Sequence, residues 1–252
     1  MFLRRLPKNL VNQIAAGEVI ERPAAVVKEL VENSIDSGAD NIDIFFAQGG
    51  KTIISVADNG CGMSSEELPL ALERHATSKL NENDLQNVKF LGFRGEALPS
   101  IGAVSRLTLT SRKADEENAW SISIEGGEIH NVIPAALTAG TRVEVRDLFF
   151  ATPARLKFLK SLRTEQTRLI EIINRLAMAH PKISFTLSNE QKQILNFKLQ
   201  NGPPDEIQLN RLSAIMGRSF SDNAMKIFSE RNGLLLKGYA GLPTLNRGNG
   251  SK

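Results

Sequence analysis

One stretch, residues 23–36 with the sequence PAAVVKELVENSID, limits the fold more than any other, because its spacing predicts a helix with two distinct faces. Pro23 suits the first turn, where its missing N–H would have no partner, and Gly38 supplies the left-handed residue that ends a helix. An apolar stripe is formed by Val26, Val27, Leu30, Val31 and Ile35. The stripe predicts that this helix packs one side against a core.

The other face of the same predicted helix carries side-chain oxygens. Glu29, Glu32, Asn33 and Asp36 follow one another at i, i+3, i+4 and i+7. A carboxylate and a carboxamide one turn apart are what a hard cation, its attached phosphates and a water to be activated would need. Taken alone, an ordinary solvated helix face explains these residues better, since charged faces are usually only that. Two later stretches favour the ligand site.

Composition excludes several classes of protein. The 252 residues are 41% hydrophobic and 23% charged, without a run of about twenty apolar residues and without a secretory signal, so we expect an intracellular, cytoplasmic globular protein. The single cysteine, Cys61, excludes an internal disulfide framework, and three scattered histidines do not form a metal set. A net charge of +3 allows a polyanionic partner without requiring one.

Residues 41–47 and 51–58, joined across Gln48, Gly49 and Gly50, predict a β-hairpin. Alternation along the second strand places Ile54, Val56 and Asp58 on one face. A carboxylate that continues an apolar face costs about 1–3 kcal/mol unless something donates a hydrogen bond to it. Either the following Asn-Gly turn or the amino group of a ligand could satisfy Asp58, and at this point both alternatives stand.

Glycines and a predicted anion site follow Asp58. Gly60 and Gly62 let the backbone approach a ligand closely, and Ser64 to Glu67 form a capping box that predicts a helix through Arg74. Residues 75–91 predict a mobile loop, and the run LGFRGEAL ends it at the start of a helix over residues 96–104. Free N–H groups at such a helix start suit phosphate, although a lone pair of glycines is more often a hinge. A nucleotide with its metal is the simplest ligand that uses all three stretches, and no P-loop or dinucleotide fingerprint is present.

The remainder of the chain predicts strands near residues 107–109, 119–124, 128–132, 141–145, 183–187 and 193–197, with a long helix over 165–179. Five basic residues between 155 and 168 could meet DNA phosphates, although a solvated face explains them somewhat better. Residues 201–204, Asn-Gly-Pro-Pro, predict a linker. We therefore expect a first domain over residues 1–200 and the start of a second, smaller α/β domain over residues 205–252, cut within it.

Together these motifs resemble the GHKL ATPases, the group of gyrase B subunits, heat-shock chaperones and sensor histidine kinases. Within that group the chain is most similar to the MutL family of DNA mismatch repair proteins. The resemblance rests on NQIAAGEVIERPAAVVKELVENSIDSGA, DNGCGM, RHATSK, LGFRGEALPSI, GTRVEV and DLFFATPARLKFL, which cover the first 160 residues almost without interruption. It implies an α/β two-layer sandwich with a mixed sheet, the Bergerat ATP-binding fold, an N-terminal arm over residues 1–22 and an ATP lid over residues 75–98.

The resemblance also implies roles for single residues. Glu29 is expected to be the general base, Asn33 the Mg²⁺ ligand, and Asp58 the acceptor of the adenine amino group, supported by Thr141 through water. The base would be bordered by Gly60, Gly62 and Met63, and the triphosphate wrapped by Thr77, Ser78, Lys79, Leu91, Gly92, Phe93, Arg94, Gly95, Glu96, Ala97 and Leu98. ATP and Mg²⁺ are the implied cofactors.

The family resemblance further implies partners: DNA, a MutS-type mismatch-recognition protein, downstream repair enzymes, and a second copy of the chain in the ATP-bound full-length protein. The implied function is an ATP-driven switch of mismatch repair. Alternatives are another GHKL ATPase, such as a topoisomerase subunit or chaperone, or a nucleotide-gated binding module with incidental hydrolysis. Because the chain omits the family's later regions, we expect it to bind ATP, to hydrolyse it weakly and to dimerise poorly.

Overall fold

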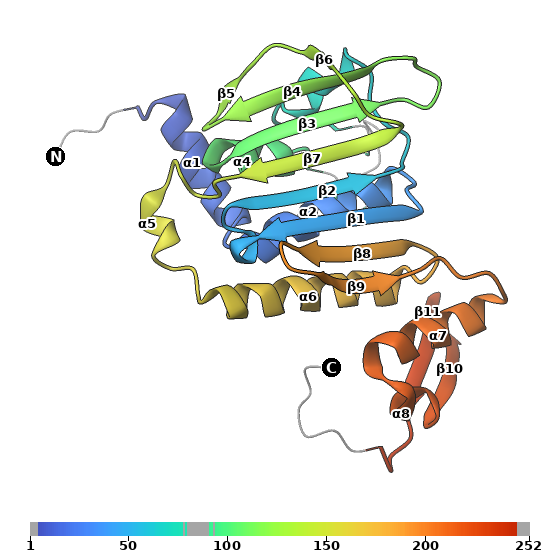
Figure 1. Ribbon diagram of the computed structural model, residues 1–252. Coiled ribbons are helices and arrows are strands. Elements are labelled where there is room, and N and C mark those ends of the chain that lie inside the picture. Colours follow the sequence, from blue (N-terminus) through green and yellow to red (C-terminus); the bar gives the residue numbers. More distant parts are fainter. Residues whose placement is uncertain (1–4, 78, 80–90, 93, 246–252) are drawn as a thin grey trace.

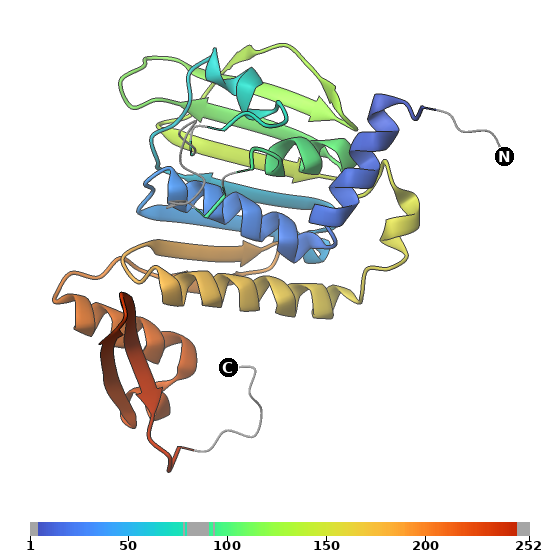
Figure 2. The same cartoon turned by 180° about the vertical axis from the view of Figure 1, so that it is seen from behind.

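A nine-stranded sheet covered on one face by helices forms the main body of the protein (Figures 1 and 2). This computed structural model describes residues 5–77, 79, 91–92 and 94–245. The helices of the body are α1 (Lys8–Val19), α2 (Pro23–Asp36), α3 (Glu67–Ala71), α4 (Ala97–Val104), α5 (Pro153–Leu156) and α6 (Leu162–Ala179). Its strands are β1 (Asn41–Ala47), β2 (Ile53–Asp58), β3 (Arg106–Arg112), β4 (Ala119–Glu125), β5 (Glu128–Ile129), β6 (Ile133–Ala135), β7 (Gly140–Arg146), β8 (Ser184–Asn189) and β9 (Gln193–Phe197).

The order of the strands is β5-β4-β3-β7-β2-β1-β8-β9, with β6 also paired to β4. Strand β1 runs parallel to β8, and the other neighbours are antiparallel, so the sheet is mixed. The predicted hairpin is the β1–β2 pair, in which Ile42 faces Asp58 and Ala47 faces Ile53. The fold class predicted from sequence, an α/β two-layer sandwich with a mixed sheet, is confirmed.

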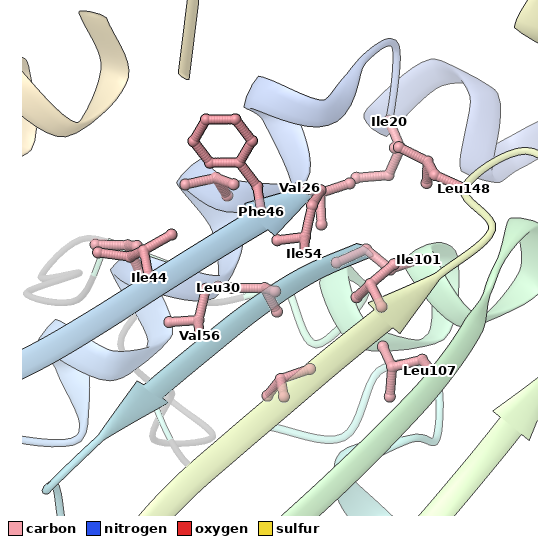
Figure 3. Packing of buried hydrophobic residues seen from close by; sticks show 14 of the residues in the cluster. Ile20, Val26, Leu30, Ile44, Phe46, Ile54, Val56, Ile101, Leu107 and Leu148 are labelled. Carbon is pink, nitrogen blue, oxygen red and sulfur yellow. The ribbon is translucent and has the colours of Figure 1, made fainter. Parts of the chain in front are cut away.

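The core lies between the sheet and helices α1, α2 and α4 (Figure 3). The predicted apolar stripe of α2 supplies Val26, Val27 and Leu30, all 2% exposed or less, and β2 supplies Ile54 and Val56. Alternation therefore has its expected effect on β2, because the side chains of one face are buried and those of the other are partly exposed. This packing fixes α2 across the sheet and leaves its polar face turned away from the core.

Helix α1, within the N-terminal arm that the resemblance implies, lies on the body of the protein. Ala16 and Ile20 are fully buried, and the Arg155 guanidinium donates to the Ile20 carbonyl oxygen at 3.1 Å. Gly17 makes room for this contact, since a Cβ there would lie 1.4 Å from an Arg155 nitrogen. Leu10, Val11 and Ile14 on the same helix are exposed.

Two predicted boundaries were wrong. The capping box forms, with the Ser64 N–H donating to Glu67 Oε2 at 2.8 Å, but helix α3 ends at Ala71 and not at Arg74. Its last amides turn to i−3 acceptors, Leu72 to Pro69 and Glu73 to Leu70, and His75 then takes a positive φ of 65°. Of the strand predicted over residues 128–132, only Glu128–Ile129 forms a strand, β5, and the next strand, β6, begins after that range, at Ile133.

A second, small unit follows β9 and consists of α7 (Pro204–Met216), α8 (Arg218–Ser221) and the hairpin β10 (Ala224–Arg231) with β11 (Leu234–Gly241). We propose that the boundary between the two units lies at residues 201–204, since the hairpin forms a separate sheet. Among the residues that the structure describes, no helix is long and apolar enough to cross a membrane.

The two units are joined by a buried arginine. Arg211 of α7 is 1% exposed, and its guanidinium donates to the carbonyl oxygens of Ala177, Pro181, Ile183 and Lys198 at 2.8–3.4 Å. It also lies over the Phe185 and Phe197 rings, 5.9 and 5.2 Å from their centroids. The carbonyl of Ala177 belongs to the last turn of α6, where a helix favours a cation.

Replacing Arg211 with methionine is expected to destabilise the protein by about 1–3 kcal/mol, because buried carbonyl groups lose their donors while the apolar volume is roughly kept. Chemical denaturation would measure the change in the free energy of unfolding. Arg218→Met is the matched control, since Arg218 is exposed on α8. Equal stabilities of the two variants would contradict this account of Arg211.

Candidate functional site

A row of polar side chains crosses the sheet where three apolar strand faces end. On β2 the buried face runs Ile54, Val56, Asp58; on β7 it runs Val145, Val143, Thr141; on β3 it runs Leu107, Leu109, Ser111. The register pairs Asp58 with Thr141 and Thr141 with Ser111. The three polar residues are therefore neighbours at one edge of the core, and Asp58 contacts the C-terminal half of α2 through Ser34.

Asp58 is held by donors from two directions. The Ser34 hydroxyl on α2 donates to Asp58 Oδ2 at 2.7 Å, and the Gly60 N–H donates to Asp58 Oδ1 at 2.9 Å. Burial raises the pKa of Asp58 above its ordinary value of 3.8, while the hydrogen bonds from Ser34 and from the Gly60 and Thr141 backbones oppose the rise. The turn after Asp58 thus supplies one hydrogen-bond donor, the Gly60 N–H. Helix α2 supplies a second donor, the Ser34 hydroxyl, which the sequence did not indicate.

The raised pKa of Asp58 predicts a pH-dependent cost. For an acid whose pKa is higher in the folded protein, the unfolded chain binds fewer protons, so stability falls as pH rises from 3.8 through the raised value. Asp58→Asn removes this charge, and its melting temperature relative to wild type should increase from pH 4 to pH 7. Asp43→Asn, at an exposed position on β1, is the control. A difference that is independent of pH would contradict the prediction.

The polar row continues into the glycine loop. Ser111 Oγ lies 2.8 Å from Thr141 Oγ1 and accepts a hydrogen bond from the Met63 N–H, also at 2.8 Å. Gly62 has φ +70°, and a Cβ on it would lie 2.2 Å from the Arg112 carbonyl oxygen, so this close approach requires glycine. The residues that the resemblance assigns to the adenine pocket, Asp58, Gly60, Gly62, Met63 and Thr141, are brought together.

The polar face of α2 divides into two parts. Lys28 contacts Glu29 at 3.4 Å and Glu32 at 2.8 Å, and the Glu29 side chain is 27% exposed. One turn beyond Glu29, the Lys79 ammonium donates to Asn33 Oδ1 at 2.9 Å and to Asp36 Oδ2 at 2.6 Å. The solvated-face alternative fits Glu29 in part, but the Asp36 side chain is only 6% exposed.

The phosphate-loop residues begin at the same face of α2. The N–H groups of Leu91 and Gly92 donate to the two Asp36 carboxylate oxygens, each at 3.2 Å.

The other predicted phosphate-loop residues lie near the start of α4. The His75 N–H donates to the Gly95 carbonyl oxygen at 3.1 Å, and His75 Nδ1 lies 3.5 Å from Glu96 Oε1. Ala97 and Leu98 form the first turn of α4, as the anion-site prediction requires. Thr77 Oγ1 accepts from the Lys79 N–H at 3.2 Å, and Arg94 is exposed. Ser78, Phe93 and the predicted mobile segment of residues 80–90 lie outside the described residues.

Sequence reasoning missed three residues. Ser34 was hidden by its place among apolar neighbours, and Ser111 could have been found by the alternation argument that identified Asp58. Asp36 was noticed on the helix face but was given no role. Its contacts with Lys79, Leu91 and Gly92 join segments more than forty positions apart, which no local pattern encodes.

Comparison with known proteins identifies the family of this chain. Residues 21–147 match the family described as histidine kinase-, DNA gyrase B- and HSP90-like ATPase. The solved structure of the Aquifex aeolicus MutL ATPase domain complexed with ADP is 31% identical, with a TM-score of 0.72, over 92% of this chain and 80% of that one. The chain belongs to the MutL family of GHKL ATPases. A DNA mismatch repair protein MutL from Paramagnetospirillum magneticum is 58% identical over 98% of the chain, and one from Rhodospirillum rubrum is equally similar.

The chain spans 41% of the Paramagnetospirillum MutL and 39% of the Rhodospirillum MutL. A further solved structure, described as the N-terminal domain of a DNA repair protein, is 26% identical with a TM-score of 0.73 over 91% of this chain and 70% of that one. The family match over residues 21–147 includes Asp58, Ser111 and Thr141, and the two MutL proteins are similar over 98% of the chain.

The site's oxygens also fit a magnesium ion. Asn33 Oδ1 and Asp36 Oδ2 are a carboxamide and a carboxylate that already share one cation, the Lys79 ammonium. Carboxylate and amide oxygens are ligands of Mg²⁺, which keeps several waters and binds phosphates. The residues present thus match the donor set that a metal-bound triphosphate would need.

Proposed function

We propose that this chain binds ATP between α2, the polar row and the start of α4, and hydrolyses it. The observation that carries the proposal is the Asp58–Thr141–Ser111 row, which has one carboxylate at the end of an apolar strand face, where it could accept from the adenine amino group. Gly60, Gly62 and Met63 then border the base. Glu29, on the exposed part of α2, polarises the attacking water.

The phosphates and the metal occupy the other end of the site in this proposal. Asn33 would hold Mg²⁺, which would neutralise the phosphate charge when bound. Thr77, Ser78, Lys79 and the run from Gly92 to Leu98, with Leu91 beside it, would wrap the triphosphate. Helix α4 begins at Ala97, after Glu96, and the N–H groups of its first turn would support the anion role.

The wider role follows from the MutL relatives. We propose an ATP-driven switch of DNA mismatch repair, with DNA, a MutS-type recognition protein, downstream repair enzymes and a second copy of the chain as partners, in the cytoplasm. Because the chain spans about two-fifths of these relatives, slow hydrolysis and weak dimerisation by the 252-residue protein are part of the proposal. The high identity to MutL proteins favours this role over a topoisomerase subunit or a chaperone.

Isothermal titration with ATP, ADP and GTP, each with Mg²⁺ and with EDTA, tests the nucleotide proposal directly. We expect adenine nucleotides to bind in preference to GTP, since a carboxylate can accept from the adenine amino group but not from the guanine carbonyl. Magnesium should tighten ATP binding. Heat changes that are the same for ATP and GTP, or that are absent for both, would overturn the assignment of Asp58 to the base.

Hydrolysis measured separately distinguishes the switch from a nucleotide-gated binding module. A switch should release phosphate in multiple turnovers, however slowly, whereas a binding module should hold intact ATP. Single-turnover assays with protein in excess over ATP give the rate even when turnover is slow. Retention of unhydrolysed ATP over many hours would favour the binding module.

A further inference from the structure

The Lys79 ammonium lies where the magnesium ion of the proposed site would have to bind. It donates to Asn33 Oδ1 at 2.9 Å and to Asp36 Oδ2 at 2.6 Å. The pair is largely shielded, because the Lys79 side chain is 18% exposed and that of Asp36 is 6% exposed. An ion pair in such a setting is screened by water less than one on an open surface.

The Asp36 carboxylate accepts hydrogen bonds from Lys79 and from the backbone at residues 91–92. Its Oδ1 accepts from the Leu91 N–H, and its Oδ2 accepts from the Gly92 N–H as well as from Lys79. A Cβ built on Gly92 would lie 3.6 Å from both Asn33 Oδ1 and Lys79 Nζ, so the backbone of Gly92 lies directly against the ion pair. Positions 79 and 91–92 are therefore fixed to α2 through one side chain.

We propose that Lys79 acts as a built-in cation that neutralises Asp36 and occupies Asn33 until a metal-bound nucleotide displaces it. The inference rests on the proposed function, in which Asn33 holds Mg²⁺. A metal ion and an ammonium on the same amide oxygen would repel each other strongly, so the metal should bind Asn33 only after the ammonium has left it. Asp36 is the positioning residue, because it keeps Lys79 over Asn33 before the metal arrives.

This arrangement has a consequence for metal binding in the absence of nucleotide. With Lys79 in place, a divalent cation meets a positive charge beside its ligand oxygens and should not bind on its own. When a nucleotide is present, its phosphates offer the displaced ammonium a new anionic partner, so metal and nucleotide should bind together. The lysine thus prevents the site from taking up metal without its substrate.

Titration with Mn²⁺ alone, followed by the loss of its free electron paramagnetic resonance signal, tests the proposal without nucleotide. We expect Lys79→Met to bind one Mn²⁺ at least about tenfold more tightly than wild type, because a unit positive charge beside the ligand oxygens has been removed. Lys226→Met is the matched control: Lys226 also pairs with an aspartate, Asp205, but on the second unit. Adding Asn33→Ala to Lys79→Met should abolish the gain.

The outcomes separate this inference from the proposed function. Equal Mn²⁺ binding by wild type and Lys79→Met would overturn the built-in cation even if both proteins bind ATP. Tighter Mn²⁺ binding that persists after Asn33→Ala would also overturn it, since the metal would then bind elsewhere. Failure to bind any nucleotide would instead count against the proposed function.

A second variant, Asp36→Asn, tests the proposal even if Lys79→Met does not fold. Asp36→Asn keeps an oxygen that can accept from the Leu91 or Gly92 N–H but removes the negative charge that holds Lys79. Because Asp36→Asn releases Lys79 from Asn33, Mn²⁺ should raise the melting temperature of this variant and of Lys79→Met, but not that of wild type. An Asp36→Asn protein that responds to Mn²⁺ no more than wild type would contradict the role of Asp36.

Discussion

Replacing Glu29 with alanine is expected to slow ATP hydrolysis by about 10²–10⁴-fold while leaving ATP binding close to that of wild type. The carboxylate lies on α2 one turn before Asn33, is partly exposed, and is contacted by Lys28 at 3.4 Å. It is therefore accessible to a water and adjacent to the proposed metal ligand. The rate of phosphate release in single-turnover assays would measure the effect, with calorimetry for binding.

Glu32→Gln is the control for Glu29, because Glu32 lies on the same helix and makes the closer contact with Lys28, at 2.8 Å. It tests whether the loss of any carboxylate on this face slows the reaction. We expect Glu32→Gln to retain most of the hydrolytic rate. Similar losses in both variants would show that the charge of the helix face matters and that Glu29 is not the general base.

Replacing Asp58 with alanine should weaken adenine-nucleotide binding by roughly 10- to 100-fold, since it removes a hydrogen bond to a charged acceptor worth about 1.5–3 kcal/mol. The variant also leaves the Ser34 hydroxyl and the Gly60 N–H without the acceptors they have now. Binding is measured by calorimetry with ADP and Mg²⁺, and melting temperature is measured in parallel.

Asp43→Ala is the control for Asp58, because Asp43 lies exposed on the neighbouring strand β1. We expect it to bind ADP like wild type. A folded Asp58→Ala protein that still binds ADP with wild-type affinity would remove the adenine-reading role from the polar row. An Asp58→Ala protein that does not fold would be replaced by Asp58→Asn, for which a smaller loss of affinity is expected, because the carboxamide oxygen can still accept from the amino group but carries no charge.

Much of the fold could be predicted because period and alternation are local properties of the sequence. The bounds of α2 followed from Pro23, its apolar stripe and Gly38, and the place of Asp58 followed from the two residues before it on the same face. The early end of α3 could not be predicted, because the N–H groups of Leu72 and Glu73 bond to i−3 carbonyl oxygens there and neither residue type signals this change. Local rules locate elements better than they locate their ends.

The site was predicted in part for a similar reason. Strand alternation indicates which residues share a face, but it does not say that β7 lies between β2 and β3, so the contact between Thr141 and Ser111 needed the strand order. The Lys79–Asp36 pair depends on how the chain after α3 returns to α2, which is a tertiary property. The roles given to single residues by the family resemblance stay predictions until the variants are measured.

The register of β7 limits which sequence changes this protein can accept during evolution. A shift of β7 by one residue would place Gly140 or Arg142 where Thr141 now lies. The same shift would turn Val143 and Val145 out of the core, so the register change would cost free energy at both the polar and the apolar positions. The register is thus fixed in part by Val143 and Val145, which the proposed site does not use. Residues 136–139, between β6 and β7, include exposed positions. Insertions there should lengthen the connection without moving the row of Asp58, Thr141 and Ser111.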